Sequence, residues 1–141
     1  MRTIPRFAAL MLTCAASACA SDAGGAADAA APGAPDASRG SWVARSLRGA
    51  EGPPRMALGD GKVRGHTGCN GFSATYARAA DGSITFGAIV SSKKFCEGEA
   101  GRSEQRVLRA LAAARRATIV GDTLTLRDAA GVALLAWKRA R

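Results

Sequence analysis

The sequence predicts an α+β fold: a single domain in which one long amphipathic helix packs on a curled antiparallel sheet of about seven or eight short strands. Two observations predict it. Short segments in which apolar and polar residues alternate recur along the chain, and glycine-containing turns separate them, a pattern typical of antiparallel strands. One segment instead has apolar residues at helical spacing, and its apolar side has to be buried against the sheet.

The N-terminal segment is typical of a secretory signal peptide. Two arginines form a positively charged start, and an apolar stretch of about ten residues follows from Phe7. This stretch is too short to span a bilayer as a helix, which takes about 20 apolar residues. The tripeptide Ala16–Ala18 then offers the small side chains that a signal peptidase accepts. We therefore predict that residues 1–18 are a signal peptide.

Cleavage at that point makes Cys19 the first residue of the mature protein. The segment Ala16–Cys19 resembles a bacterial lipobox, in which the cysteine thiol receives a diacylglycerol and the new amino terminus is acylated. Several acyl chains anchor a protein stably, because each buried methylene contributes about 0.8 kcal/mol. Ala20, rather than an aspartate, follows the cysteine, which favours an outer-membrane lipoprotein facing the periplasm. The alternative is a soluble periplasmic or secreted protein in which Cys19 is an unpaired thiol.

A spacer separates Cys19 from the folded part. Residues 20–38 consist only of alanine, glycine, proline, serine and aspartate. Such a segment cannot bury enough apolar surface to offset the entropy lost on ordering. We predict that residues 19–38 form a disordered tether and that residues 39–141 form the domain.

Turn signals divide the domain into strands. Gly59–Gly61, Asp81-Gly82 and Gly121-Asp122 each supply a glycine for a tight hairpin turn. In Thr123–Leu126 the apolar residues alternate, as a half-buried strand requires. The predicted strands are Ser41–Leu47, Arg55–Leu58, Lys62–His66, Phe72–Arg78, Ser83–Ala88, Thr118–Val120, Thr123–Arg127 and Val132–Lys138.

The segment Glu99–Arg116 does not share this alternation. Val107, Leu108 and Leu111 lie at the spacing that places them on one side of a helix. Acidic residues near the start of the segment and two arginines at its end favour the helix dipole. We predict an amphipathic helix over about residues 99–116, with its apolar stripe packed on the sheet.

The chain is basic, with a formal net charge of +9 from 20 Lys and Arg and 11 Asp and Glu. Removal of Arg2 and Arg6 with the signal peptide leaves 18 basic residues against 11 acidic ones, or +7. An exported basic protein meets the anionic headgroups of the envelope rather than nucleic acid, so we expect no nucleic-acid partner. The bias of a GC-rich genome towards arginine, alanine and glycine explains this charge equally well.

The densest group of reactive side chains is His66, Cys69 and Asn70, with Cys96 further along the chain. As a metal site, His66, Cys69 and Cys96 lack a fourth protein ligand and the close spacing of zinc motifs. As a catalytic pair, Cys69 and His66 point to opposite faces of a strand. We favour a structural interpretation, because two cysteines in an oxidising compartment form a disulfide.

A Cys69–Cys96 disulfide closes a loop of 28 residues, counted from 69 to 96 inclusive. In the chain-entropy account such a loop contributes about 3–4 kcal/mol. Beside it, Gly68, Asn70 and Gly71 are expected to shape a tight turn, with Asn70 in the left-handed conformation. We identify no catalytic group, cofactor site or metal site among these residues, so we expect a protein that is not an enzyme.

Several motifs carry a family resemblance. They are Gly65–Tyr76 with its Gly-Cys-Asn turn, Ser91–Cys96, Glu104–Leu111 and Gly121–Leu126. Together they resemble the META domain of HslJ-like bacterial lipoproteins, over about residues 41–137. The resemblance implies an envelope protein connected with heat or envelope stress, drug tolerance or, in distant relatives, motility, without established catalytic residues.

For the function, we expect a stress-related module of the periplasm that binds or protects an unfolded chain, an envelope protein or an anionic envelope component through its basic surface. One alternative is an inhibitor or sequestering domain that presents the loop Ser91–Phe95, with Lys93 and Lys94, to an envelope enzyme. A solvated loop is the plainer interpretation of the two lysines. The other alternative is a small thiol-dependent enzyme that uses Cys69 or Cys96.

Overall fold

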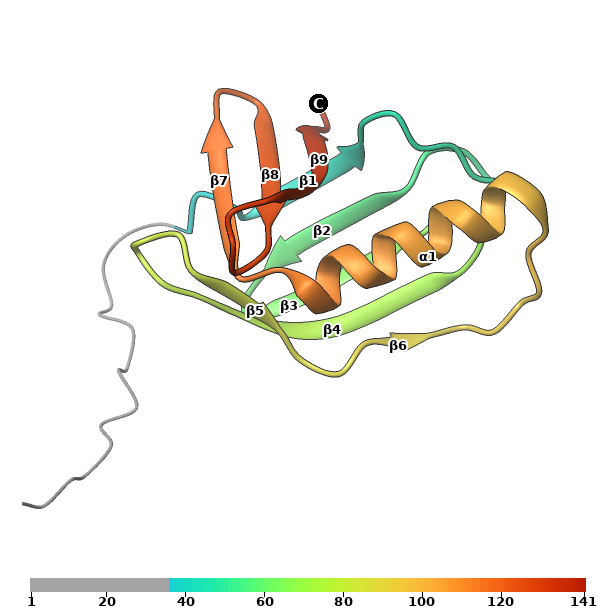
Figure 1. Ribbon diagram of the computed structural model, residues 1–141, viewed down its shortest axis with the longest axis horizontal. Coiled ribbons are helices and arrows are strands. Elements are labelled where there is room, and N and C mark those ends of the chain that lie inside the picture. The colour runs from blue at the N-terminus through green and yellow to red at the C-terminus, as the bar shows by residue number, and fades with distance from the viewer. Residues whose placement is uncertain (1–35) are drawn as a thin grey trace, which may run out of the picture.

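The computed structural model of the protein describes residues 36–141 (Figure 1). The predicted signal peptide, the predicted lipidation site Cys19 and the tether up to residue 35 lie outside these residues. The described chain forms nine strands and one helix. In chain order they are β1 (Gly40–Ala44), β2 (Arg55–Gly59), β3 (Lys62–His66), β4 (Gly71–Arg78), β5 (Ile84–Phe86), β6 (Val90–Ser91), α1 (Gly98–Ala113), β7 (Arg116–Val120), β8 (Thr123–Arg127) and β9 (Ala133–Arg139).

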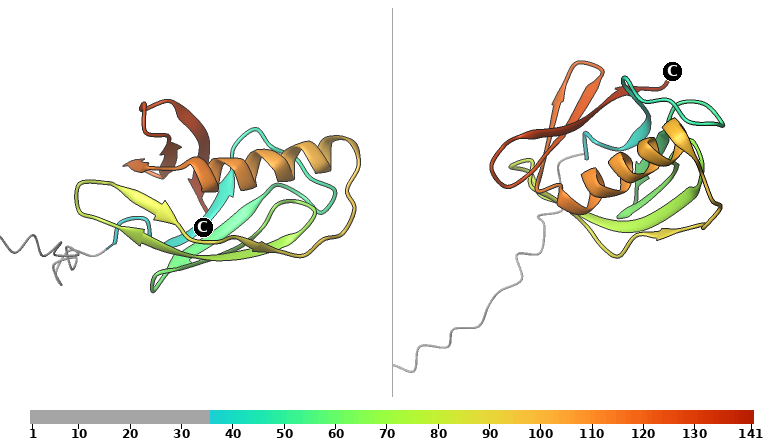
Figure 2. Two further views of the ribbon diagram at one scale, coloured as in Figure 1. Left: turned by 60° about the horizontal axis from the view of Figure 1, so that its bottom comes forward. Right: turned by 45° about the vertical axis from the view of Figure 1, so that its right-hand side comes forward.

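The strands form one antiparallel sheet in the order β5-β4-β3-β2-β1-β9-β8-β7, with β6 also paired to β4. The two ends of this order approach each other. The Ile84 N–H donates to the Arg115 carbonyl at 3.0 Å, and the Ala117 N–H donates to the Gly82 carbonyl at 2.8 Å. The sheet is therefore nearly closed, and Figure 2 shows α1 on its concave side. The predicted fold, with one helix on a curled antiparallel sheet, is confirmed.

The core lies where the apolar side of α1 meets the sheet. Val107 and Leu111 of α1 are fully buried, and α1 contacts β5, β8 and β9. The strands contribute alternate side chains, such as Leu124 and Leu126 of β8. The largest fully buried apolar side chains are Trp42, Trp137, Ile84, Leu111, Leu124, Leu126, Val63 and Val107. The apolar stripe of the helix is thus used for packing.

Several details of the fold differ from the prediction. β1 ends at Ala44 rather than at Leu47, and β5 spans Ile84–Phe86 rather than Ser83–Ala88. The sequence does not predict β6, because two residues are too few to show alternation, and β6 raises the number of described strands to nine. The predicted helix end near Arg116 is wrong: α1 ends at Ala113, since Ala114 is extended (φ −61°, ψ 133°) and Arg116 pairs with Arg127. The Arg115 guanidinium nevertheless donates to the Ala114 carbonyl at 2.7 Å, so positive charge lies at the helix end.

The helix α1 has 16 residues and lacks the length and apolar character that crossing a membrane requires, and no other helix lies within residues 36–141.

The N-terminal boundary of the domain also differs from the prediction. Asp36 and Ser38, which the composition assigns to the tether, belong to the fold, and Ser38 is fully buried. The Trp42 indole N–H donates to the Ser38 carbonyl at 2.7 Å, and the Tyr76 hydroxyl donates to the Asp36 carboxylate at 2.6 Å. The boundary predicted at Arg39 therefore moves to Asp36. Composition misses this segment because hydrogen bonds, not apolar side chains, hold it.

The Asp36 carboxylate is stabilised in its charged form. Burial raises the pKa of Asp36, but hydrogen bonds from Ser38 and Tyr76, together with the charge of Arg78, outweigh burial and hold the pKa below its ordinary value. Burial, and then the hydrogen bond to Asp36 and its charge, raise the pKa of Tyr76 to about 12. At neutral pH the pair is therefore a neutral hydroxyl that donates to an ionised carboxylate.

Candidate functional site

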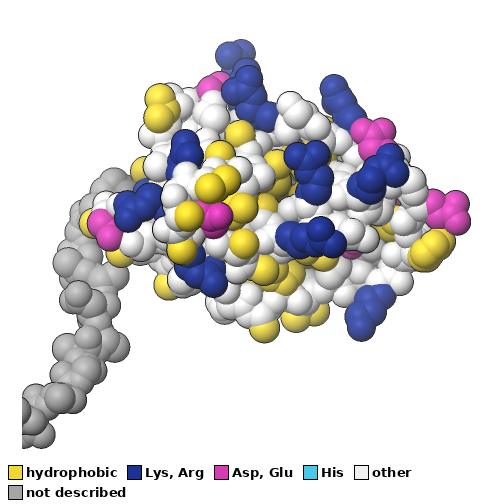
Figure 3. Space-filling model, in the orientation of Figure 1, with side chains coloured by type: hydrophobic (Ala, Val, Ile, Leu, Met, Phe, Trp, Pro, Cys, Tyr) yellow, Lys and Arg dark blue, Asp and Glu magenta, His cyan; other side chains and the backbone are white. Residues whose placement is uncertain are grey.

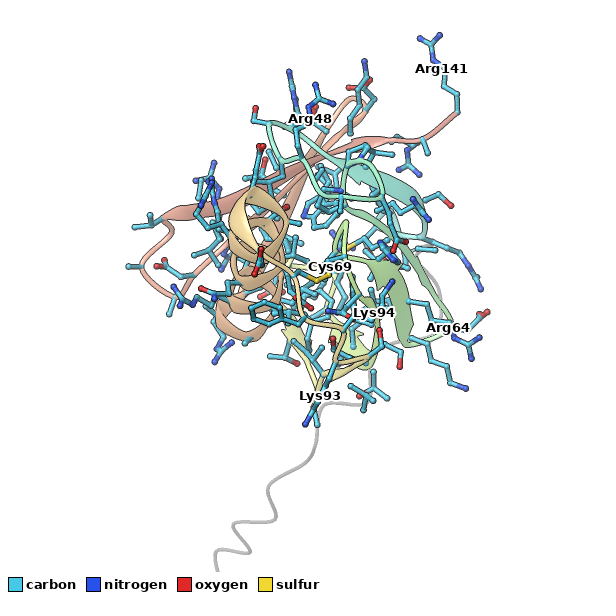
Figure 4. All side chains as sticks on the ribbon, turned by 90° about the vertical axis from the view of Figure 1, so that its right-hand side faces the viewer. Arg48, Arg64, Cys69, Lys93, Lys94 and Arg141 are labelled. Carbon is cyan, nitrogen blue, oxygen red and sulfur yellow. A yellow bond between two sulfur atoms is a disulfide. The ribbon has the colours of Figure 1, made fainter. Side chains whose placement is uncertain are left out.

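Three segments meet at one end of the molecule, which we call the disulfide end (Figure 4). They are the β1–β2 loop at residues 45–54, the β3–β4 turn at residues 67–70 and the segment between β6 and α1 at residues 92–97. Cys69 and Cys96 form a disulfide here, with their Cα atoms 6.3 Å apart. The bond joins the β3–β4 turn to the segment that leads into α1.

The β3–β4 turn is built around Thr67 and Gly68. The Thr67 hydroxyl accepts hydrogen bonds from the N–H groups of Cys69 and Asn70, at 3.3 and 2.9 Å. The left-handed conformation belongs to Gly68 (φ 91°), so its expected assignment to Asn70 is wrong. A Cβ at Gly68 would lie 2.7 Å from the Cα of Gly49, so only glycine allows the β1–β2 loop to approach the turn this closely.

Asn70 acts through its side chain, which is buried to 1% exposure. Its Oδ1 accepts hydrogen bonds from the Ser92 hydroxyl and the Lys94 N–H, both at 2.9 Å. Its Nδ2 donates to the Lys94 carbonyl at 3.0 Å and to Glu104 Oε2 at 3.1 Å. Asn70 therefore ties the turn to the segment before α1 and to α1 itself, a role that the sequence does not reveal because its partners are far along the chain.

Glu51 of the β1–β2 loop connects two other predicted site residues. Its carboxylate contacts His66 Nε2 at 3.1 Å and Lys94 Nζ at 2.6 Å. The hydrogen bond from Lys94, and then its charge, hold the pKa of Glu51 below its ordinary value. Lys94 is thus engaged in an ion pair, whereas Lys93 is exposed and forms none with the residues of the described domain.

The structure does not assemble the metal set that the sequence raised. His66 turns towards Glu51, and its Nδ1 accepts a hydrogen bond from the Gly68 N–H at 3.1 Å. The potential metal ligand beside Cys69 and Cys96 is instead Glu104, with all three ligand atoms within 4.8 Å of one another. Since the two sulfurs are bonded to each other, this group offers one free ligand and no thiolate nucleophile.

A shallow hollow of about 480 Å³ lies next to the disulfide. The hollow is lined by Ala50, Glu51, Cys69, Lys94, Phe95, Cys96, Glu97 and Ala100. Phe95, at one side of it, is 88% exposed. The lining therefore combines apolar side chains with charges of both signs.

A second feature is the solvent-facing side of α1, which we call the arginine face. It consists of Arg102, Arg106 and Arg109, which lie on one side of the helix at spacings of four and three residues and are exposed. None of the three forms an ion pair with another described residue. Figure 3 shows Lys and Arg side chains gathered over this region.

The described domain as a whole is basic, like the arginine face. Two of the 20 basic residues and two of the 11 acidic residues precede residue 36, so residues 36–141 carry 18 basic against nine acidic side chains. The domain alone therefore has a formal net charge of +9, with His66 counted as neutral. Residues 36–141 therefore carry the whole formal net charge of the chain.

Comparisons with known proteins place the chain in a family. The family model for the META domain matches residues 36–141. Among solved structures, the NMR structure of a protein from Burkholderia xenovorans has a TM-score of 0.57 and 24% sequence identity, and the match covers 72% of this chain and 81% of that one. A second NMR structure has a TM-score of 0.57 and 18% identity, with coverage of 72% and 90%. At these identities the two structures show a shared fold. No curated protein matches the chain.

Proposed function

This chain belongs to the META domain family, and from that premise we propose that it is a non-enzymatic, lipid-anchored module that binds an anionic component of the bacterial envelope under stress. The family indicates a bacterial protein associated with the cell envelope. We infer the lipid anchor from residues 16–19, the anionic ligand from the arginine face, and the connection with stress from the resemblance to HslJ-like lipoproteins.

The arginine face carries the proposal. Helix α1 packs with its apolar side in the core, so the opposite side is free to meet a ligand. Unpaired guanidinium groups bind phosphate with two parallel hydrogen bonds, and envelope lipids present phosphate groups in quantity. Because Arg102, Arg106 and Arg109 have no acidic partners among the described residues, binding would not require any ion pair of the domain to break.

The sequence before residue 36 supports a position at the membrane surface. The segment Ala16–Cys19 resembles a lipobox, with Ala16 at the position where leucine is commonest, so Cys19 is the residue that lipid-modifying enzymes would acylate. An acylated Cys19 would hold the domain near the bilayer, where the negative surface potential attracts basic side chains within about 10 Å. The acyl chains and the basic side chains would then both contribute to the affinity for the membrane, so neither has to supply all of it.

We predict that reversing the arginine face abolishes binding to anionic membranes. The mature chain from residue 19, with Cys19→Ser so that no lipid is attached, should bind vesicles that contain phosphatidylglycerol. The triple variant Arg102→Glu, Arg106→Glu, Arg109→Glu should bind at least about 100-fold more weakly, because each basic residue near such a surface contributes about 1 kcal/mol. Co-sedimentation with vesicles at low and high salt measures the effect.

The matched control reverses three exposed basic residues, Arg55, Lys62 and Arg64, on β2 and β3. Figure 4 shows Arg64 on the side of the molecule away from α1. This variant has the same net charge as the first and should lose only a few-fold in affinity. An equal loss in both variants would mean that binding follows net charge alone, and it would overturn the role of the arginine face.

We also predict that Cys19 is the acylated residue. When the full-length chain is expressed in a Gram-negative host, it should incorporate radiolabelled palmitate and fractionate with membranes, and Cys19→Ser should remove both properties. Cys14→Ser, which changes a cysteine inside the predicted signal peptide, should leave both unchanged. A labelled Cys19→Ser protein, or an unlabelled wild type, would contradict the lipid anchor.

A further inference from the structure

We propose that the disulfide end is a self-association surface, through which two copies of this chain pair by a two-fold contact around Phe95. This goes beyond the proposed binding of an anionic envelope component, and it rests on different residues. Three properties of the disulfide end support it: an exposed aromatic side chain on a fixed backbone, a partly apolar hollow next to that side chain, and charges of opposite sign on either side of it.

Phe95 is exposed although its neighbours are held firmly. The backbone of Lys94 is bound on both its N–H and its carbonyl by the Asn70 side chain, and Cys96 is in the disulfide. The ring is 88% exposed and is not part of the hydrophobic core. Because the backbone on either side of the ring is already held, less conformational entropy is lost when the ring binds, and aromatic residues are enriched among those that dominate interfaces.

The hollow beside Phe95 can take an aromatic ring. Its lining includes Ala50, Ala100 and the disulfide, so an entering ring would meet apolar atoms there, next to the charged side chains of Glu51, Lys94 and Glu97. Each copy carries both the ring and the hollow, side by side. A two-fold axis between two copies therefore places each Phe95 ring over the hollow of the other copy, which is the self-complementary arrangement of a symmetric dimer.

The charged residues on either side of Phe95 also favour a second copy of this chain as the partner. Lys93 and Glu97 are exposed, lie on either side of Phe95 in the chain, and form no ion pair with any described residue. A two-fold axis reverses their order in the second copy, so that Lys93 of each copy faces Glu97 of the other. An anionic membrane fits this end less well, since Glu97 and Glu99 would be repelled by it.

A contact between two copies through Phe95 lies far from Asp36, where the described chain begins. Asp36 contacts Tyr76 near one end of β4, whereas Ser92 contacts Gly71 at the opposite end. Figure 1 likewise places the start of the described chain and the loop before α1 at opposite ends of the molecule. A dimer through Phe95 therefore leaves the segment towards Cys19 unobstructed.

Sedimentation of the mature chain with Cys19→Ser, over a roughly hundredfold range of concentration, tests the proposal. The wild-type surface should show a monomer–dimer equilibrium, and Phe95→Asp should weaken it at least about 30-fold, the effect typical of removing a central aromatic anchor. Val120→Asp is the matched control: Val120 is 79% exposed on the β7–β8 hairpin, and its variant should dimerise as the wild type does. Thermal unfolding confirms that both variants are folded.

Charge reversal then tests the two-fold geometry. Lys93→Glu alone and Glu97→Lys alone each place like charges opposite one another twice in a homodimer, so each should weaken dimerisation. Mixing the two variants places opposite charges together at both positions, and dimerisation should return. A wild type that stays monomeric throughout, equal dimerisation of Phe95→Asp, or no recovery on mixing would each overturn the proposal. A monomer whose vesicle binding depends on Phe95 would assign the ring to membranes instead.

Discussion

Replacing Cys69 and Cys96 with alanine is expected to lower the free energy of unfolding by about 3–4 kcal/mol, a large part of the net stability of a domain of this size. The disulfide spans 27 positions of sequence, and without it the unfolded chain gains the entropy of the open loop. The melting temperature should fall by roughly 10–30 °C. Urea unfolding followed by the fluorescence of the buried Trp42 and Trp137 measures the change.

The control for this variant is the wild type under reducing conditions. If loop closure is the source of the stability, the reduced wild type and the double alanine variant should unfold at similar urea concentrations. A titration of thiols in the folded, unreduced domain should find neither Cys69 nor Cys96 free. Two free thiols, or a variant as stable as the wild type, would contradict a structural disulfide and favour a thiol-dependent activity.

Asn70→Ala is expected to lower the free energy of unfolding by about 3 kcal/mol, because it removes four hydrogen bonds at once. Each buried polar group that loses its partner costs about 1–3 kcal/mol, and part of that cost is recovered where water reaches the segment before α1. The amide of Lys94 donates to Asn70 Oδ1, so its hydrogen exchange should accelerate more than that of core amides such as Leu124. Urea unfolding and hydrogen exchange measure the two effects.

Asn70→Asp separates the hydrogen bonds of this side chain from its size. The variant keeps the acceptor for Ser92 and Lys94 but places a second oxygen against the Lys94 carbonyl and the Glu104 carboxylate. Burial and Glu104 should raise the pKa of the new carboxyl, so its stability relative to the wild type should fall as pH rises through that pKa and recover at acid pH. Ser73→Ala, an exposed change on β4, should stay within about 0.5 kcal/mol. An Asn70→Asp variant as stable as the wild type at neutral pH would show that the donated bonds are unimportant.

The hairpins could be predicted because each depends on turn residues and on an alternation of apolar residues within a short stretch of the chain. In the β2–β3 turn, Asp60 and Gly61 both have positive φ, at 51° and 68°, and the sequence Asp-Gly supplies the two residues that tolerate this conformation. Alternation of apolar residues then identifies the buried face of each strand, as at Leu124 and Leu126. The pairing of Cys69 with Cys96 needed only a count, since the predicted domain contains no other cysteine.

The end of α1 could not be predicted in the same way. The residues up to Arg116 continue a pattern that a helix accepts, and Arg116 leaves the helix because it pairs with Arg127 across a hairpin. Phe95 shows the opposite limit. The sequence predicts only that Phe95 lies in a loop that can be presented to a partner, whereas the structure shows that the ring is 88% exposed between a hydrogen-bonded Lys94 and a disulfide-bonded Cys96.

The mixed fold with one helix, the hairpin strands, the family and the candidate cysteine pair follow from the sequence alone, because turns, periodicity and motifs depend on residues close together in the chain. The roles of Asn70, Glu51 and Asp36 depend on contacts that form only in the folded protein. The partners of Asn70 lie 22, 24 and 34 positions away, and Asp36 meets Tyr76 across 40 positions. Contacts at such separations arise when the sheet curls and α1 packs on it, and a short polar residue looks the same in the sequence whether or not it makes them.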